Sequence, residues 1–113
     1  MKATLLALIL TALSALAACN DVQQAVDQTA RQGAKGVVTE TLATRFPQVP
    51  KELITPFTDC IIDNASALEI RDFARAAVVG VDERTVETIR SVLSRPETVR
   101  CLQSRALSSG IVG

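Results

Sequence analysis

The chain has 113 residues and carries 12 basic and 12 acidic side chains, with no histidine, tryptophan or tyrosine. Without histidine, it lacks the usual ligand of zinc and haem iron and the usual base that activates a nucleophilic serine. Because the charges are balanced and form no basic stripe, we expect no binding to nucleic acid.

The first 18 residues have the layout of a secretory signal peptide. Lys2 precedes an apolar run from Leu5 to Leu16, and the small residues Ala17 and Ala18 follow. The apolar run has about 12 residues, whereas a membrane span needs roughly 20, so we expect the segment to be cleaved rather than retained as an anchor. An ordinary signal peptide that ends in two alanines is the alternative interpretation.

A cysteine stands directly after these small residues, so that Leu16-Ala17-Ala18-Cys19 resembles a bacterial lipobox. The resemblance implies that diacylglycerol is attached to the Cys19 sulfur, that the chain is cut before Cys19 and that the new amino terminus is acylated, for example with palmitate. Because several acyl chains hold a protein stably on a bilayer, we expect membrane contact through Cys19. The next residue is Asn20 rather than aspartate, which favours the periplasmic face of the outer membrane over the inner membrane.

Processing would leave 95 of the 113 residues, with 11 basic and 12 acidic side chains, because Lys2 is the only charged residue of the leader. This length allows one small domain whose core is marginal without further stabilisation. We expect residues 19–45 to form the lipidated cysteine and an amino-terminal helix or spacer. Residues 46–113 are then expected to form the compact helical domain.

A helix is predicted from Asp21 to about Arg45. Its apolar positions recur at near-helical spacing, but the stripe is thin and consists of Val22, Val26, Ala30, Gly33 and Val37. Gly33 and Gly36 each weaken a helix by about 1 kcal/mol relative to alanine. We expect a loosely docked helix that acts as a spacer; the alternative is that its small residues admit the close approach of a partner helix.

Three prolines then interrupt the helical pattern between Phe46 and Pro56, where residues 51–54 form at most one helical turn. The next helix is predicted to begin with Thr55 as N-cap and Pro56 as its first residue, and to run to Asn64. Its spacing places Phe57, Cys60, Ile61 and Ala65 on one face, with Cys60 toward the core.

Capping residues mark the helices that follow. Ser66 and Glu69 form a capping-box pattern for a helix that ends at Gly80, and Asp82 is predicted to cap the next helix. The apolar positions of these two helices are Leu68, Ile70, Phe73, Ala74 and Ala77 in the first, and Val86, Ile89 and Leu93 in the second.

The last helix is predicted to begin at a second capping box, Ser94 with Glu97, with Pro96 in its first turn and its end at Gly110. Its apolar face would consist of Val99, Leu102 and Ala106, with Cys101 beside it. No run with a period of two residues is long enough for a strand. The mature chain is therefore predicted to be all-α, with about five helices.

Cys60 and Cys101 are the two cysteines that remain after the anchor. In an oxidising compartment two such cysteines most often pair, and a loop of about 40 residues closed by their disulfide would stabilise the fold by roughly 4 kcal/mol. A redox-active pair and two free thiols are the alternatives. The absence of a Cys-x-x-Cys motif disfavours the first of these.

Several charged and hydroxyl side chains are candidate site residues, and each has a simpler structural explanation. Asp59 and Asp63 share a helix face, but two carboxylates fall short of the six or more oxygens of a calcium site. Arginines suited to a carboxylate or phosphate alternate with acids, as on a solvated face: Arg71, Arg75, Arg90, Arg95, Arg100 and Arg105, with Asp72, Glu87 and Glu97. Ser108 and Ser109 lack a histidine, and the remaining lysines are Lys35 and Lys51. We therefore predict no catalytic, cofactor-binding or metal-ligating residues.

Beyond the lipobox, three segments resemble a group of small envelope lipoproteins of marine and photosynthetic alphaproteobacteria. They are Arg45-Phe46-Pro47, Thr58-Asp59-Cys60-Ile61-Ile62-Asp63-Asn64-Ala65 and Arg95-Pro96-Glu97-Thr98-Val99-Arg100-Cys101. The resemblance implies a lipid-anchored helical domain with two cysteines and implies no activity. Some members carry the label succinate dehydrogenase, an enzyme that needs a flavin domain, an iron–sulfur domain or haem-bearing spans. This chain supplies none of these, so we interpret that label as a misassignment.

The anchor, the spacer-like helix and the lack of active-site motifs favour a non-enzymatic, lipid-anchored envelope protein. We expect it to act by protein–protein contact as an accessory or structural component, with a partner that the sequence does not identify. The alternatives are a periplasmic chaperone-like module, similar in outline to small disulfide-tied acid-stress chaperones, and a helical module that binds a small ligand or lipid.

Overall fold

The computed structural model describes residues 1–108, and for residues 13–23 it describes the backbone without the side chains. Several sequence predictions lie outside this description: the lipidation of Cys19, the sorting role of Asn20, the stripe position Val22, the hydroxyl of Ser109 and the helix end at Gly110. Within the part that the structure describes, no helix combines the length and the apolar character needed to cross a membrane.

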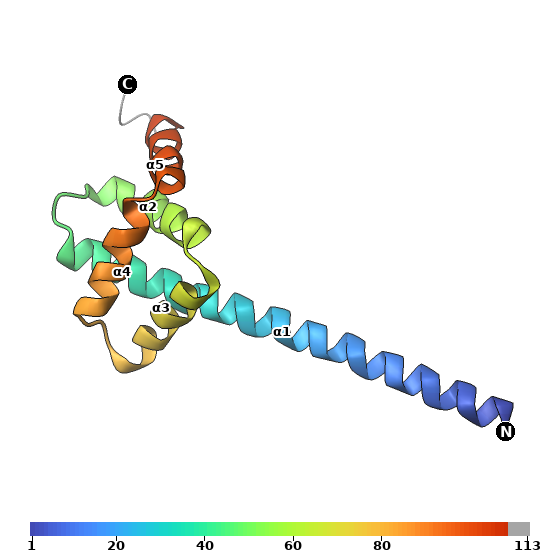
Figure 1. The fold of residues 1–113 in the computed structure, drawn as a ribbon. Coiled ribbons are helices and arrows are strands. Elements are labelled where there is room, and N and C mark those ends of the chain that lie inside the picture. The colour runs from blue at the N-terminus through green and yellow to red at the C-terminus, as the bar shows by residue number, and fades with distance from the viewer. Residues whose placement is uncertain (109–113) are drawn as a thin grey trace.

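Five α-helices make up the described part of the chain (Figure 1). They are α1 (Lys2–Arg45), α2 (Lys51–Asn64), α3 (Ala67–Val79), α4 (Glu83–Leu93) and α5 (Pro96–Ser108). No described residue lies in a strand. A disulfide joins Cys60 of α2 to Cys101 of α5, with their Cα atoms 5.7 Å apart. The predicted all-α class with one disulfide is therefore confirmed.

Helix α1 has two parts with different surroundings. Its first part projects from the bundle as a single rod (Figure 1), and its described apolar side chains are exposed: Leu5, Leu6, Leu8, Ile9, Leu10 and Val26. From Ala30 onward it lies against α2 and α3 and contributes Ala34, Val37, Val38 and Leu42 to the core. The packed unit thus begins about 16 positions before Phe46, the residue at which the compact domain was expected to start.

Small residues on the facing helix explain why this thin stripe packs well. A Cβ added to Gly33 would stand 3.8 Å from the Cα of Ala74 and 3.9 Å from the Cβ of Ala77, both on α3. The two helices therefore approach closely at Gly33. The small residues of α1 serve the close approach of a partner helix, which was the alternative interpretation, and that partner is α3 of the same chain.

The hydrophobic core is built by the first four helices and the connection after α1. Besides the α1 residues it contains Phe46, Ile61, Ile62, Ile70, Phe73, Ala76, Val86, Ile89 and Val92. Phe73 is the largest side chain that is fully buried. At the end of α1, Arg45 forms an ion pair with Glu83, and the Arg90 guanidinium lies 5.8 Å from the centre of the Phe46 ring. These contacts fix α4 against the carboxyl-terminal end of α1.

The predicted start of α2 at Thr55 and Pro56 is wrong. The helix begins at Lys51, after Pro50 in extended conformation, so that the single turn expected at residues 51–54 continues into the helix. Pro56 is accommodated inside α2 because the backbone hydrogen bond that it removes belongs to the carbonyl of Glu52, at the solvent-exposed start of the helix.

Two of the four predicted N-caps are confirmed. Ser66 and Glu69 form the capping box of α3, Asp82 caps α4, and Gly80 follows α3 with φ +101°. The predicted capping role of Ser94 is wrong, because Ser94 ends α4 and its hydroxyl donates a hydrogen bond to the Ser91 carbonyl at 2.8 Å. The last helix instead begins at Pro96.

Part of the predicted apolar pattern is also wrong. On α3, Leu68 is exposed, and on α5 Val99 is exposed while Leu102 and Ala106 are only partly buried. The buried side chain of α5 is that of Thr98. Thr98 lies one turn before Cys101, on the same helix face. The rotation of α5 about its axis therefore follows the bond to the fully buried Cys60 rather than its apolar stripe.

The glycines of the chain provide a test of this packing. A Cβ at Gly36 would meet no atom within 4 Å, so Gly36→Ala should raise the free energy of unfolding by about 0.5–1 kcal/mol through helix propensity alone. Gly80→Ala is the matched control. Its φ of +101° and ψ of 156° suit only glycine, so the same change there should destabilise by about 1–3 kcal/mol. Urea denaturation of both variants measures whether each substitution raises or lowers the free energy of unfolding. A destabilised Gly36→Ala would contradict the open space found beside Gly36.

Candidate functional site

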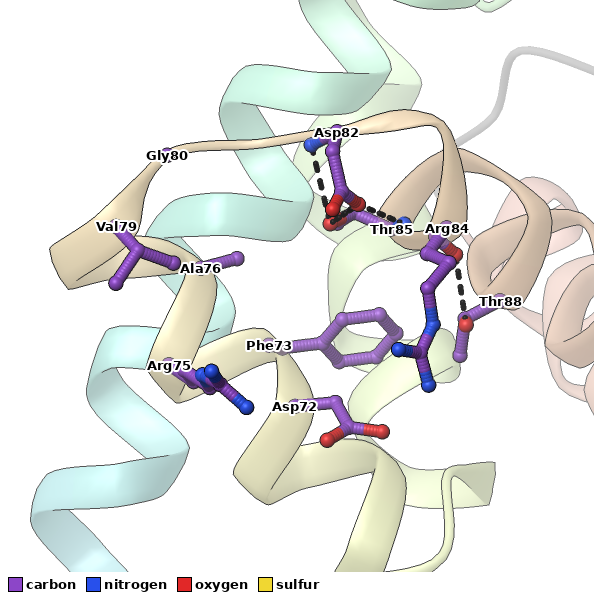
Figure 2. A pocket seen from close by; sticks show the side chains of 10 residues that line it. All are labelled: Asp72, Phe73, Arg75, Ala76, Val79, Gly80, Asp82, Arg84, Thr85 and Thr88. Carbon is purple, nitrogen blue, oxygen red and sulfur yellow. Dashed lines mark hydrogen bonds between the residues drawn. The ribbon is translucent and has the colours of Figure 1, made fainter.

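The described part of the chain contains a shallow cavity of about 170 Å³ between α3 and the start of α4 (Figure 2). Phe73 and Ala76 form its apolar wall, and its other lining residues are Asp72, Arg75, Val79, Gly80, Asp82, Arg84, Thr85 and Thr88. Pockets for small organic ligands have volumes of about 300–1,000 Å³. This cavity is therefore large enough for a few water molecules or one small polar group.

The charged groups around the cavity are mixed in sign. Asp82 is already engaged, since its Oδ1 accepts hydrogen bonds from the backbone N–H of Thr85 at 3.0 Å and from its hydroxyl at 3.2 Å. The backbone hydrogen bond from Thr85 is the main reason that the pKa of Asp82 lies below its usual value. The side chains of Asp72, on α3, and Arg84, on α4, extend toward one another in Figure 2. Acids and arginines here offset one another, so the cavity has no preference for an ion of one sign.

A second polar cluster joins three helices at the bend between α4 and α5. Arg95 donates from Nη1 and Nη2 to both carboxylate oxygens of Glu69, at 2.9 and 2.7 Å. Its Nη1 also donates to the Asn64 carbonyl at the end of α2, at 2.9 Å. Glu69 Oε1 in addition accepts from the backbone N–H of Ser66 at 2.7 Å. The Glu69 carboxylate thus completes the capping box of α3 and also accepts hydrogen bonds from Arg95, which lies between α4 and α5.

The electrostatics of this cluster follow from its geometry. The Glu69 side chain is 17% exposed and that of Arg95 33% exposed, so water screens their interaction only in part. The hydrogen bond from Arg95 is the main reason that the pKa of Glu69 lies below its usual value, and the same bond raises the pKa of Arg95. Every oxygen of the Glu69 carboxylate has a protein donor. The cluster therefore acts as a structural junction that links the end of α2 and the start of α3 to the bend before α5.

Acid should weaken this junction. Because the pKa of Glu69 is lowered by folding, its contribution is present above its pKa in the unfolded chain and is lost as the pH falls through the folded value. We expect Glu69→Gln to cost about 1–2 kcal/mol near pH 7, after allowance for partial exposure, and to lose less stability on acidification than the parent. Denaturant unfolding of the parent and of Glu69→Gln at about pH 7 and about pH 3.5 measures how much stability each loses on acidification. Equal losses would show that Glu69 has the same pKa in the folded and the unfolded chain.

The structure separates the remaining candidate residues. Asp59 pairs with Lys35 of α1, whose Nζ lies 3.0 Å from Oδ1, whereas Asp63 is exposed. Arg90 pairs with Glu87 one turn earlier, at 2.7 Å. The other arginines of the predicted face are exposed: Arg71, Arg75, Arg100 and Arg105. Ser108 donates to backbone carbonyls of its own helix. No three described His, Cys, Asp or Glu side chains are grouped so that they could hold a metal ion.

Sequence reasoning missed one unusual group, the hydroxyl of Thr98. It is fully buried, and its Oγ1 has no hydrogen-bond partner among the described residues. Thr98→Val keeps the shape and removes this unpaired oxygen, so it should raise the free energy of unfolding by about 1 kcal/mol. Thermal unfolding measures this gain, with Thr44→Val at an exposed position as the control for the change in composition. A loss of stability in Thr98→Val would indicate a partner for the hydroxyl.

Comparison of the chain with protein-family models, with curated proteins and with solved structures found no match. The interpretation of its function therefore depends on the residues and the geometry described above.

Proposed function

We propose that this chain is a lipid-anchored protein of the bacterial envelope that is not an enzyme and acts through protein contacts, as an accessory or structural component. The observation that supports this best is the course of α1. One unbroken helix contains Cys19, the predicted lipid attachment point, and the core residues Ala34, Val37, Val38 and Leu42. An anchor at Cys19 would thus be connected to the folded unit without a flexible linker.

The helix also sets the reach of such an anchor. Cys19 and Ala30, the first α1 residue packed against the core, are 11 positions apart. At 1.5 Å per residue the intervening helix spans about 16 Å. The domain would therefore be held close to the membrane surface, where it meets other membrane-bound proteins more readily than soluble ones.

The anchor is tested first. Growth of the native host with an alkyne-bearing fatty acid, followed by purification of the tagged protein, should give a labelled band in the membrane fraction. Cys19→Ser should remove both the label and the membrane association, whereas Cys101→Ser, which alters a cysteine of the domain, should keep the label. Label that persists in Cys19→Ser, or a soluble and unlabelled parent, would overturn the lipid anchor.

The partner is tested by crosslinking in living cells, tagged pull-down and mass spectrometry, with Cys19→Ala as the unanchored control. One protein recovered with the anchored form alone supports an accessory subunit. A broad set of denatured clients favours the chaperone-like alternative instead. Substrate turnover with saturation kinetics by the purified protein would overturn the non-enzymatic assignment.

The cavity between α3 and α4 is the observation that favours the ligand-binding alternative. Its volume of about 170 Å³ restricts that alternative to a small polar molecule. Native mass spectrometry of the protein, with Arg84→Ala as the control, would detect such a ligand as a mass adduct that the variant loses.

A further inference from the structure

Helix α5 is attached to the domain in a different way from the other four helices. None of the buried residues of the core cluster, and none of the partly buried hydrophobic residues packed against it, belongs to α5. Its apolar side chains face outward or are only partly buried: Val99 is 39% exposed and Leu107 65% exposed. In Figure 1 α5 extends from the bundle beside α2, on the side away from the projecting part of α1. The hydrophobic effect therefore contributes less to the docking of α5 than to the packing of the four core helices.

Several contacts tie the bend before α5 and the first two turns of α5 to the rest of the domain. Arg95 fixes the bend just before the helix, through Glu69 and Asn64. Thr98 is buried, but its unpaired hydroxyl opposes docking rather than supporting it. The bond from Cys101 to the fully buried Cys60 is then the strongest link between the body of α5 and α2.

We propose that the Cys60–Cys101 disulfide is a redox-controlled latch. When a dithiol reductant opens it, residues 102–108 of α5 leave α2 while the core of α1–α4 stays folded. The consequence is the exposure of the α2 face around Cys60, together with the inner side of α5. This redox regulation does not depend on the proposed lipid anchor. It goes beyond the proposed function because it gives the domain a second conformational state.

Reduction proceeds by two successive thiol–disulfide exchanges. One thiolate of the dithiol attacks the Sγ of Cys101, which is the partly exposed member of the pair, and forms a mixed disulfide while Cys60 leaves as a thiolate and takes up a proton. The second thiolate of the reductant then attacks the sulfur of the mixed disulfide that belongs to the reductant. Cys101 is released as a thiol, and the dithiol leaves as an oxidised disulfide. Two electrons thus pass from the reductant to the protein, and oxidation by a disulfide of the same class reverses both steps.

Hydrogen–deuterium exchange with mass spectrometry tests the latch. The full chain with Cys19→Ser, in detergent, contains only the two cysteines of the domain, so the result does not depend on lipidation. After reduction with dithiothreitol, amides of residues 102–108 should exchange at least about tenfold faster, at a rate near that of an unfolded peptide. Amides of residues 34–42 and 70–76 lose part of their protection with the stability that the bond supplied, but they should still exchange far more slowly than an unfolded peptide. A variant with Cys60→Ala and Cys101→Ala should show fast exchange in α5 with or without reductant.

Two results would overturn the proposal. Unchanged exchange in residues 102–108 after complete reduction would show that non-covalent contacts hold α5. Exchange of residues 34–42 and 70–76 at the rate of an unfolded peptide as well would show that the bond supports the whole fold. Thr98→Val supplies a further readout, because removal of the unpaired hydroxyl should strengthen docking and slow the exchange of reduced α5 relative to the reduced parent.

Discussion

Replacement of Phe73 by alanine should lower the free energy of unfolding by about 3–5 kcal/mol. Phe73 is fully buried and lies at the meeting point of α3 with the other core helices, so its loss removes apolar contacts and leaves a cavity. For a domain of this size, the corresponding fall in melting temperature is more than about 12 °C. Circular dichroism during heating measures the change directly.

The control for this substitution lies on the same helix. Leu68→Ala removes an apolar side chain that is 70% exposed, so it should change stability by no more than about 0.5 kcal/mol. Phe73→Leu, which keeps most of the buried volume, should fall between the two. Equal effects of Phe73→Ala and Leu68→Ala would contradict the orientation of α3 described here.

Loss of the disulfide should lower the free energy of unfolding by a similar amount. Cys60 and Cys101 are 41 positions apart, and the loop between them contains all of α3 and α4. The bond therefore restricts the unfolded form of the core even though α5 adds no residue to that core. We expect Cys101→Ser to lower the free energy of unfolding by up to about 4 kcal/mol, out of a total of about 5–14 kcal/mol for a domain of this length.

The same loss of stability can be measured without replacing Cys60 or Cys101, by reduction of their disulfide. Heating the Cys19→Ser chain with and without a phosphine reductant compares the two states without a change at the site itself. Thiol titration of the denatured, unreduced chain should find no free thiol, and two free thiols would refute the pairing. An unchanged melting temperature on reduction would show that α3 and α4 are held by packing alone.

The caps of α3 and α4 could be predicted from sequence because they depend on residues three positions apart. Ser66 with Glu69, and Asp82 with the backbone of Thr85, are satisfied within a single helical turn. The same local reasoning failed at Pro56, which is typical of a first helical position but is also tolerated where the lost hydrogen bond is solvent-exposed. Local patterns do not distinguish these two environments.

The remaining differences have tertiary causes. The docking of α1 depends on Ala74 and Ala77, which lie about 40 positions from Gly33 and leave room for close approach. The orientation of α5 depends on a covalent bond to α2, which overrides its own apolar stripe. Nothing in the spacing of Glu69 and Arg95 indicates that they meet, because each has a local explanation, Glu69 in its capping box and Arg95 on a solvated helix face. The pairing of the two cysteines could be predicted, since few alternatives existed.

Because α1 is one continuous helix, it fixes the orientation of the domain about the helix axis relative to the amino-terminal end of α1. Each residue of an α-helix advances the chain by 100° of rotation. One alanine inserted in the exposed stretch of residues 24–29 would therefore turn the surfaces of α2–α5 by about 100° around the helix axis, while raising them by only about 1.5 Å. Seven inserted alanines would return those surfaces to within about 20° of their original direction. The register of this one helix thus sets the direction in which the surfaces of α2–α5 face relative to its amino-terminal end.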